Sequence, residues 1–339
     1  MNRKKFLATA TGLGALVPAM QARMPAPVSE IRPPYLKVGD TIGITSPAGF
    51  ILLNELTPAI DLMKSWGFKI KIGATIGTRY LSFGGTDDAR THDMQLMLDD
   101  DSINAVMCAR GGYGMLRIID RLNFEKFSKK PKWILGFSDI TVLHSHINRN
   151  FGIATIHSKM CNSFPDNWNS ADTLEQSTIL SIKTALTGVR SDYSIIPSGY
   201  NRGGQCEGAL AGGNLKTLET LSGTASDLYL NGKILFLEDT GEYLYSIDRM
   251  MLNLKRSGKL IGLKGLLIGG FKIKPDDPGE EFGIPLQDII LSAVKEYSFP
   301  VCFDFPVGHQ KNNFAVKCGV RHTLEVNPGK CRLTEVIPD

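Results

Sequence analysis

Apolar and polar residues follow one another along the first half of the chain in a pattern that predicts strands alternating with helices. An apolar run at 41–46 predicts a first strand, and apolar positions at helical spacing from Leu56 to Met63 predict a helix that ends at Gly67. Residues 68–76 predict a second strand, and Thr86 followed by two aspartates predicts the start of the next helix. We expect three further strands, at 105–108, 132–136 and 154–157. A short helix is expected at 115–122. This order predicts a Rossmann-like parallel sheet with helices on both faces.

The second half of the chain predicts a smaller α/β domain. Residues 161–204 are polar and contain Pro and Gly around one predicted helix, so we interpret them as a linker between an N-terminal domain, 34–160, and a C-terminal domain, 205–339. In the latter we expect helices that begin near Gly212 and Ser246, and strands at 233–238, 265–269, 301–303 and 322–326. The predicted fold class is therefore α/β with two domains, and a site in the cleft between them.

The N-terminus has the pattern of an export signal. Basic residues at positions 3, 4 and 5 precede a segment that carries no charge as far as Ala22. That segment is too short to span a bilayer stably, so we expect residues 1–22 to be a signal peptide and the protein to be exported, in a periplasm. The choice between the general secretory route and the twin-arginine route stays open, and an unused signal would leave the protein in the cytoplasm.

Charge and cysteine content narrow the function classes. Removal of the signal takes three of the 38 basic residues, which leaves 35 against 34 acidic ones and a formal charge of +1. This charge provides no electrostatic attraction for nucleic acid, which we exclude as a partner. The six cysteines contain no C-x-x-C pair, and we interpret them as buried free thiols whose disulfide status stays open.

The stretch Trp133–Thr141 predicts a strand, a sharp turn at Gly136 and a helix that begins at Ser138. A serine at a helix N-terminus can act as a nucleophile, because the free N–H groups there stabilise an anion beside its hydroxyl. It can equally be an N-cap, which is the commoner role for such a residue. This stretch alone leaves both interpretations open.

A nucleophilic serine needs a base and a group that orients the base. Glu238 ends a predicted strand and His309 follows another, so both are candidates, although a strand-terminal Glu and a loop His are each commonly solvated. The turn Arg110–Gly114 offers backbone N–H groups beside a cation, which suits an oxyanion hole or a bound carboxylate. The chain has neither a dinucleotide fingerprint nor a Walker sequence, and we expect no cofactor. His144 and His146 diverge on a helix, so we expect no metal site.

Taken together these motifs resemble the LD-carboxypeptidase family of serine peptidases, family S66. The resemblance covers roughly residues 33 to 330 and rests on five motifs in this order: Arg-Gly-Gly-Tyr-Gly114, Gly-Phe-Ser138-Asp, Phe-Leu-Glu238-Asp, Tyr245-Ser-Ile-Asp-Arg-Met250 and Pro306-Val-Gly-His309. It implies that Ser138 is the nucleophile and that Glu238 and His309 complete a triad. Candidate residues for the oxyanion hole and for substrate binding are Gly112, Asp139 and Arg110. The implied reaction removes the terminal D-alanine from a murein tetrapeptide, commonly in a homodimer.

One departure and two rival functions accompany the resemblance. Where the family commonly has T-x-H-G-P-M, this chain has Thr155-Ile-His-Ser-Lys-Met160, which puts the shape of the nearby substrate wall in doubt. The family also contains microcin-immunity enzymes, which stack a nucleotide base on an aromatic residue, for which Trp168 is the candidate here. The third reading is a binding module for muropeptides with an inert cleft, and the presence of all three expected triad residues argues against it.

Overall fold

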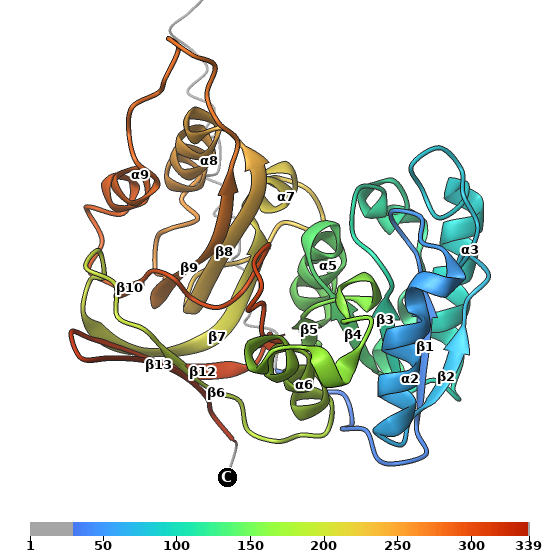
Figure 1. Ribbon diagram of the computed structural model, residues 1–339. Coiled ribbons are helices and arrows are strands. Elements are labelled where there is room, and N and C mark those ends of the chain that lie inside the picture. The colour runs from blue at the N-terminus through green and yellow to red at the C-terminus, as the bar shows by residue number, and fades with distance from the viewer. Residues whose placement is uncertain (1–29, 338–339) are drawn as a thin grey trace, which may run out of the picture.

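A computed structural model describes residues 30–337, and it consists of two β-sheets with helices packed against them (Figure 1). The expected signal peptide, 1–22, lies outside the described residues. The first sheet has the strand order β11-β5-β4-β3-β1-β2. Its strands are β1 (Thr41–Thr45), β2 (Lys69–Ile72), β3 (Ala105–Cys108), β4 (Trp133–Gly136), β5 (Thr155–His157) and β11 (Val316–Cys318). The first five are mutually parallel, as expected, and β11 joins the edge antiparallel to β5.

Helices cover both faces of this sheet and bury apolar side chains against it. They are α2 (Thr57–Ser65), α3 (Asp87–Asp99), α4 (Glu125–Lys129), α5 (Thr141–Phe151) and α6 (Thr173–Leu186). One core contains α2 and α6, and a second core contains α3, α4 and α5. The N-cap of α3 is Thr86, whose hydroxyl accepts from the N–H of Ala89, as the sequence predicts.

The second sheet has seven strands in the order β10-β9-β8-β7-β12-β13-β6. Their bounds are β6 (Asp192–Ile195), β7 (Gly204–Asn214), β8 (Lys233–Glu242), β9 (Gly265–Ile273), β10 (Val301–Cys302), β12 (Arg321–Asn327) and β13 (Lys330–Glu335). Strands β7 to β10 are parallel, and β12, β13 and β6 are antiparallel. The helices α7 (Leu215–Thr220), α8 (Leu244–Arg256) and α9 (Leu286–Ala293) are associated with this sheet and contribute to one core on it. The chain therefore has the expected two-domain α/β fold.

Several elements differ from the sequence-based expectation. Strand β2 stops at Ile72, after which the N–H groups of Ala74 and Thr75 donate to the carboxylate of Asp93. The segment expected as one helix at 115–122 forms two turns of 3-10 helix. Strand β7 was not expected, because its glycines lack the β-branched pattern that predicts strands. Gly212 and Gly213 have φ of +149° and +141°, a conformation that side chains rarely adopt. Strands β6, β11 and β13 and helix α9 were also missed.

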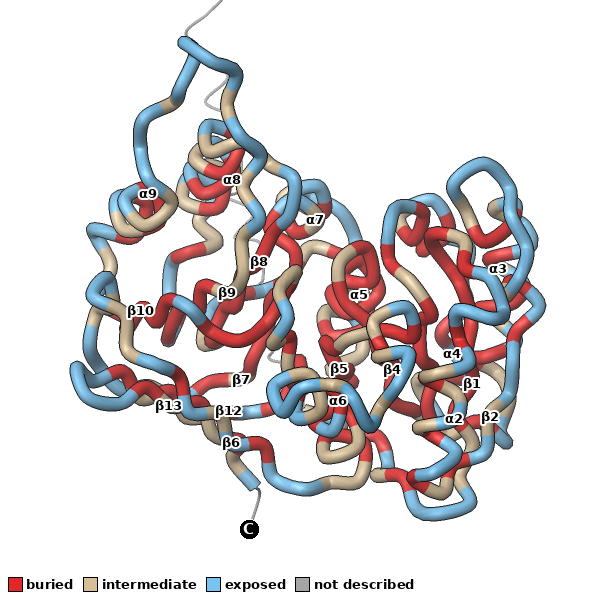
Figure 2. The backbone as a smooth tube through the Cα atoms, viewed as in Figure 1, coloured by how far each residue is buried: buried red, intermediate tan, exposed pale blue. Residues whose placement is uncertain are grey.

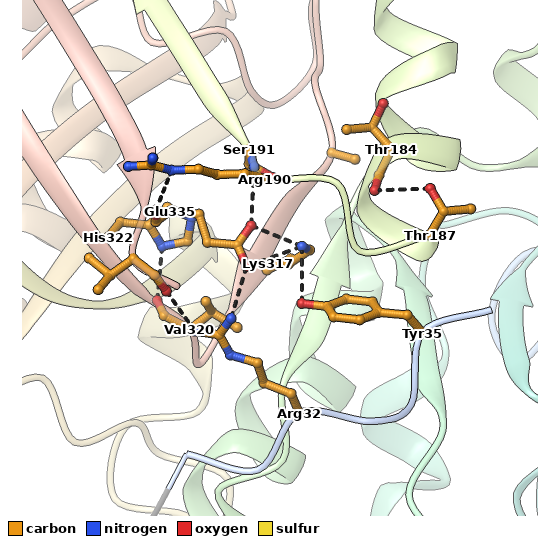
Figure 3. A network of polar contacts seen from close by, with 12 residues as sticks. Arg32, Tyr35, Thr184, Thr187, Arg190, Ser191, Lys317, Val320, His322 and Glu335 are labelled. Atoms are coloured by element: carbon orange, nitrogen blue, oxygen red, sulfur yellow. Dashed lines mark hydrogen bonds and ion pairs between the residues drawn. The ribbon is translucent and has the colours of Figure 1, made fainter. Parts of the chain in front are cut away.

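The two sheets do not follow the expected domain boundaries. Strand β11 comes from beyond β10 yet lies in the first sheet, and β6 from the expected linker lies in the second sheet. Lys317 of β11 and Glu335 of β13 form an ion pair at 2.9 Å in which both side chains are almost completely buried. Arg32 adds a second ion pair to Glu335, and Figure 3 shows this polar network between the sheets. The two sheets are thereby fixed to each other.

The buried parts of the chain follow the middle of both sheets (Figure 2). Strands β1, β3, β4 and β5 are buried along most of their length, and so is the first part of β8. Within residues 30–337, no helix is long and apolar enough to cross a membrane.

Candidate active site

Ser138 occupies a strained turn between β4 and α5. Its φ is +63°, which is uncommon for any residue other than glycine, and it opens a 3-10 turn, Ser138–Ile140, that leads into α5. Gly136 allows the turn, since a Cβ there would lie 2.9 Å from the side chain of Ile140. The strand-turn-helix geometry that the sequence predicts is thus present. It presents the half-exposed side chain of Ser138 at the carboxyl end of β4.

Glu238 and His309 lie together although they come from different elements. Oε2 of Glu238, on β8, accepts a hydrogen bond from Nδ1 of His309 at 2.6 Å. The side chain of Glu238 is fully buried, while that of His309 is 18% exposed. The bond fixes the tautomer of His309, so that Nε2 is free to accept a proton.

The loop that carries His309 packs closely against Glu238. Gly308 has φ of +95°, and a Cβ at this position would collide with the Cβ of Glu238. The neighbouring backbone is tied to β9, because the N–H of Gly270 donates to the carbonyl of Val307 at 2.9 Å. The Gly in the motif Pro306-Val-Gly-His309 is therefore required by a close approach.

Phe137 connects the candidate nucleophile Ser138 to the imidazole of His309. The ring of Phe137, which precedes Ser138, lies 5.0 Å from the ring of His309 between centroids. Within the described part of the chain, the hydroxyl of Ser138 has no hydrogen bond to His309. Bonds of this kind often form only when substrate is bound. The structure thus places Ser138 next to a residue, Phe137, that contacts the imidazole of the Glu238–His309 pair.

A cavity of about 250 Å³ lies between the two halves and reaches Ser138. The first domain contributes Ser138 and the Gly112 turn, and the second contributes residues at the ends of β7 and β8. Its lining residues include Gly112, Ser138, Asp139, Asn214, Asp239 and Glu242. The cavity has the interdomain position expected from the sequence.

Gly112 and Asp139 are the two candidate residues for an oxyanion hole near Ser138. Among the described residues, the N–H groups of Gly112 and Asp139 donate to no protein acceptor. The glycine turn lies against the serine, since a Cβ on Gly111 would be 3.1 Å from the Cβ of Ser138. The Asp139 carboxylate accepts from the N–H of Met115 at 2.7 Å, and burial raises its pKa to about 6. This side chain therefore holds the glycine turn, and the residue lines the cavity.

Arg110 lies at the start of the same turn. Its NH1 donates to the carbonyl of Phe50 at 3.3 Å, and its guanidinium stands 5.7 Å from the Phe50 ring centroid. It does not line the cavity described above. The other N–H groups of Arg110 have no acceptor within residues 30–337. The guanidinium is therefore held only by its bond to the carbonyl of Phe50, and its remaining donors are available to a ligand.

Sequence analysis missed a polar cluster on the second domain. The Asp239 carboxylate accepts from Nδ2 of Asn214 at 2.9 Å and from the N–H of Lys216 at 2.9 Å, and burial raises its pKa to about 6. Asn214 also donates its N–H to the hydroxyl of Thr141 on α5 at 3.1 Å. The cluster therefore links the two walls of the cavity. The only feature of the sequence that pointed to this cluster was a pair of acidic residues at the end of a predicted strand, Glu238 and Asp239.

The other candidates of the sequence analysis lie in separate places. His144 bonds to the carbonyl of Gly136 and His146 bonds to the hydroxyl of Ser226, and burial lowers the pKa of both. Between residues 30 and 337, no three His, Cys, Asp or Glu side chains are arranged to hold a metal ion. The six cysteines are free thiols, five of them buried.

Trp168 is partly buried against the core that contains α2 and α6, and it does not line the cavity at Ser138. Its carbonyl accepts from the side chain of Gln176 on α6 at 3.0 Å, which holds this segment to the first domain. This position removes the feature that suggested stacking of a nucleotide base.

Comparison with known proteins identifies the family. The LD-carboxypeptidase N-terminal domain matches residues 42–158, and the LD-carboxypeptidase C-terminal domain matches residues 207–324. The chain is 33% identical over 298 residues to the probable murein peptide carboxypeptidase of Bacillus subtilis, which covers 86% of this chain and 91% of that protein. It is 29% identical to the murein tetrapeptide carboxypeptidase of Pseudomonas aeruginosa, over 84% of this chain and 93% of that protein.

A solved structure agrees with both domain matches. Muramoyltetrapeptide carboxypeptidase from Oxalobacter formigenes is 28% identical and superposes with a TM-score of 0.76, over 88% of this chain and 99% of that one. The similarity therefore extends through both domains, including the segments that carry Ser138, Glu238 and His309. The chain belongs to the LD-carboxypeptidase family of serine peptidases, family S66.

Proposed function

We propose that this protein is a serine LD-carboxypeptidase that releases the terminal D-alanine from murein tetrapeptides, with Ser138, Glu238 and His309 as its triad. The observation that carries the proposal is the 2.6 Å bond between the buried Glu238 and His309, beside a serine held at φ +63°. A solvated glutamate or an N-cap serine needs neither feature. The names of the relatives from Bacillus subtilis and Pseudomonas aeruginosa support a murein peptide as substrate.

The proposed reaction uses each residue at one atom. Nε2 of His309 takes the proton from Ser138 while Oγ attacks the carbonyl carbon of the last peptide bond. The N–H groups of Gly112 and Asp139 stabilise the negative oxygen of the tetrahedral intermediate. His309 then gives the proton to the departing amine of D-alanine, and water hydrolyses the acyl-enzyme with the same base. Glu238 orients the imidazole of His309 and stabilises the imidazolium.

The direct test is to incubate the mature protein with a murein tetrapeptide and to follow the products by mass spectrometry. We expect loss of one alanine residue, and chiral analysis should identify it as D-alanine. The Ser138→Ala variant is the control, because an inert binding module would give the same result with either protein. An intact tetrapeptide after incubation with the wild type would reject the proposal.

We also propose that the protein is exported and acts as a homodimer. The basic and then uncharged segment 1–22 supports export, and the family resemblance supports a dimer. Cell fractionation should find a chain that begins near Arg23 outside the cytoplasm, and light scattering on the purified protein should give twice the mass of one chain. A cytoplasmic chain that retains residues 1–22, or a monomer mass, would contradict the respective proposal.

A further inference from the structure

We propose that His157 is a positioning residue that holds the three parts of the triad in register. The inference rests on the proposed function of Ser138, Glu238 and His309, and it assigns a role to a residue outside that triad. His157 lies on β5 and is fully buried. Its backbone pairs with Gly136 on one side and with Val316 on the other, so it is fixed in the first sheet next to the nucleophile strand.

The imidazole of His157 contacts the supports of two triad members. Its ring lies 5.7 Å from the ring of Phe137, the residue before Ser138. On another side it meets Phe236 edge-on, with 5.0 Å between centroids. Phe236 lies on β8 two residues before Glu238, so this one ring contacts both the residue before Ser138 and the strand that carries the carboxylate.

A hydrogen bond connects the same imidazole to the third member. Nε2 of His157 lies 3.1 Å from Oδ1 of Asn313, and the N–H of Gly308 donates to this oxygen at 2.8 Å. Asn313 is also fully buried. Because the backbone N–H of Gly308 must donate, Oδ1 is the acceptor for both groups, and Nε2 of His157 carries its proton. The backbone just before His309 is therefore held from the first domain.

His157 is suited to remain neutral in this position. Burial lowers its pKa to about 3, so its hydrogen-bond donor is present and uncharged across the physiological range. A neutral ring also avoids repulsion when the nearby His309 takes a proton during the reaction. The role requires a flat group with an N–H at the Nε2 position, which a glutamine amide also supplies.

The proposal is tested with four variants of the mature protein. His157→Leu removes the donor, His157→Gln keeps an N–H close to the position of Nε2, and Asn313→Leu removes the acceptor. His322→Leu is the matched control, since His322 is also fully buried and bonded to a backbone carbonyl, but it lies in the polar network of Figure 3. Each variant is assayed for tetrapeptide turnover, for labelling of Ser138 by a fluorophosphonate probe, and for its melting temperature.

We expect His157→Leu and Asn313→Leu each to lower kcat by roughly 10- to 100-fold with little change in KM, because small misplacements of catalytic groups have effects of about this size. His157→Gln should restore most of kcat, and His322→Leu should lower the melting temperature while kcat stays near wild type. The probe should label the slow variants proportionally more slowly. Three results would each overturn the positioning role. They are a wild-type kcat in His157→Leu, a kcat in His157→Gln as low as that in His157→Leu, and a loss of kcat in His322→Leu as large as that in His157→Leu.

The labelling measurement separates this inference from the proposed substrate. If the wild type is labelled at Ser138 but releases no alanine, the substrate proposal fails and the labelling rates of the variants still decide the role of His157. If the wild type is neither labelled nor active, both proposals fail. Asn313→Leu provides the same test from the other side of the bond if His157→Leu does not fold.

Discussion

Nδ1 of His309 and Oε2 of Glu238 lie 2.6 Å apart, although the two residues are separated by 71 positions along the chain. The other carboxylate oxygen, Oε1 of Glu238, is buried and has no hydrogen-bond partner within the described residues. A buried carboxylate with one partner is costly unless that partner carries the balancing positive charge. In the proposed reaction His309 carries such a charge while it holds the proton of Ser138, and the carboxylate of Glu238 beside it then balances that charge.

We predict that Glu238→Gln lowers kcat by about four orders of magnitude, as the corresponding change does in a related triad. Glutamine is close in size to glutamate, so the fold should persist, but the amide neither stabilises the imidazolium nor fixes the required tautomer. Glu207→Gln on the exposed side of β7 is the control and should leave kcat unchanged. Steady-state kinetics with a tetrapeptide decides the matter, and a loss below about tenfold would remove Glu238 from the triad.

The backbone strain at Ser138 gives a second prediction. Ser138→Ala and Ser138→Gly should both abolish turnover, because each removes the hydroxyl. They should differ in stability, since alanine keeps the side-chain penalty of φ +63° and glycine does not. We expect the glycine variant to be more stable than the alanine variant by about 1 kcal/mol in urea unfolding. Equal stability of the two would mean that the turn relaxes when the serine is replaced.

The sequence singled out each residue of the proposed triad but not the contacts that bring these residues together. Ser138 was recognisable because a strand, a glycine and a helix pattern are local features. Glu238 and His309 were recognisable as a set only through motif order, since a single carboxylate or imidazole carries no sign of its partner. The fold class was predictable for the same local reason. The spacing of apolar residues predicts each strand and each helix separately, and their order along the chain indicates an α/β fold.

What the sequence could not predict is long-range pairing. Lys317 lies in a strand that the sequence did not predict, and it is buried against Glu335 between the two sheets. His157 reads as a residue at a strand end, and its contacts with Phe236 and Asn313 depend on how the domains meet. The strand β7 was missed because its glycines are selected by close approach to Phe236 and Thr141 rather than by strand propensity.

A third prediction concerns stability in acid. Burial lowers the pKa of His322 from its ordinary 6.5 to about 4, although the nearby Glu335 acts in the opposite direction. As the pH falls below about 6.5 the unfolded chain takes up this proton first, so the stability due to neutral His322 is complete above that pH and is lost between 6.5 and 4. The loss amounts to at most about 3 kcal/mol, at about 1.4 kcal/mol per pKa unit.

The His322→Leu variant isolates this contribution. It should be less stable than the wild type at pH 7, where a backbone carbonyl has lost its partner, and the difference should shrink on going to pH 4.5. The buried His144 and His157 titrate in both proteins and cancel in the comparison. Urea unfolding at the two pH values measures the change. If the difference in unfolding free energy between the two proteins does not depend on pH, His322 takes up its proton in the folded protein as readily as in the unfolded chain.

The last prediction asks how a carboxypeptidase recognises the end of its substrate. We propose that Arg110 binds the terminal carboxylate, because it stands at the glycine turn beside Ser138 with only one N–H bonded, to the carbonyl of Phe50. A guanidinium binds a carboxylate through two parallel hydrogen bonds, and a lysine ammonium cannot reproduce this fork. Arg110→Lys should therefore lower kcat/KM for the tetrapeptide and reduce the preference for a free acid over a C-terminal amide.

Arg79 provides a matched control for this substitution. Its guanidinium lies 4.2 Å from the ring of Phe50, the same ring that Arg110 faces, and it donates to the carbonyl of Leu81. Arg79→Lys should leave the ratio of kcat/KM for acid and amide peptides unchanged. If Arg110→Lys also leaves that ratio unchanged, Arg110 only braces the loop through Phe50. The terminal carboxylate must then be bound by a residue that lines the cavity, and Lys216, which does so, is the next cation to replace.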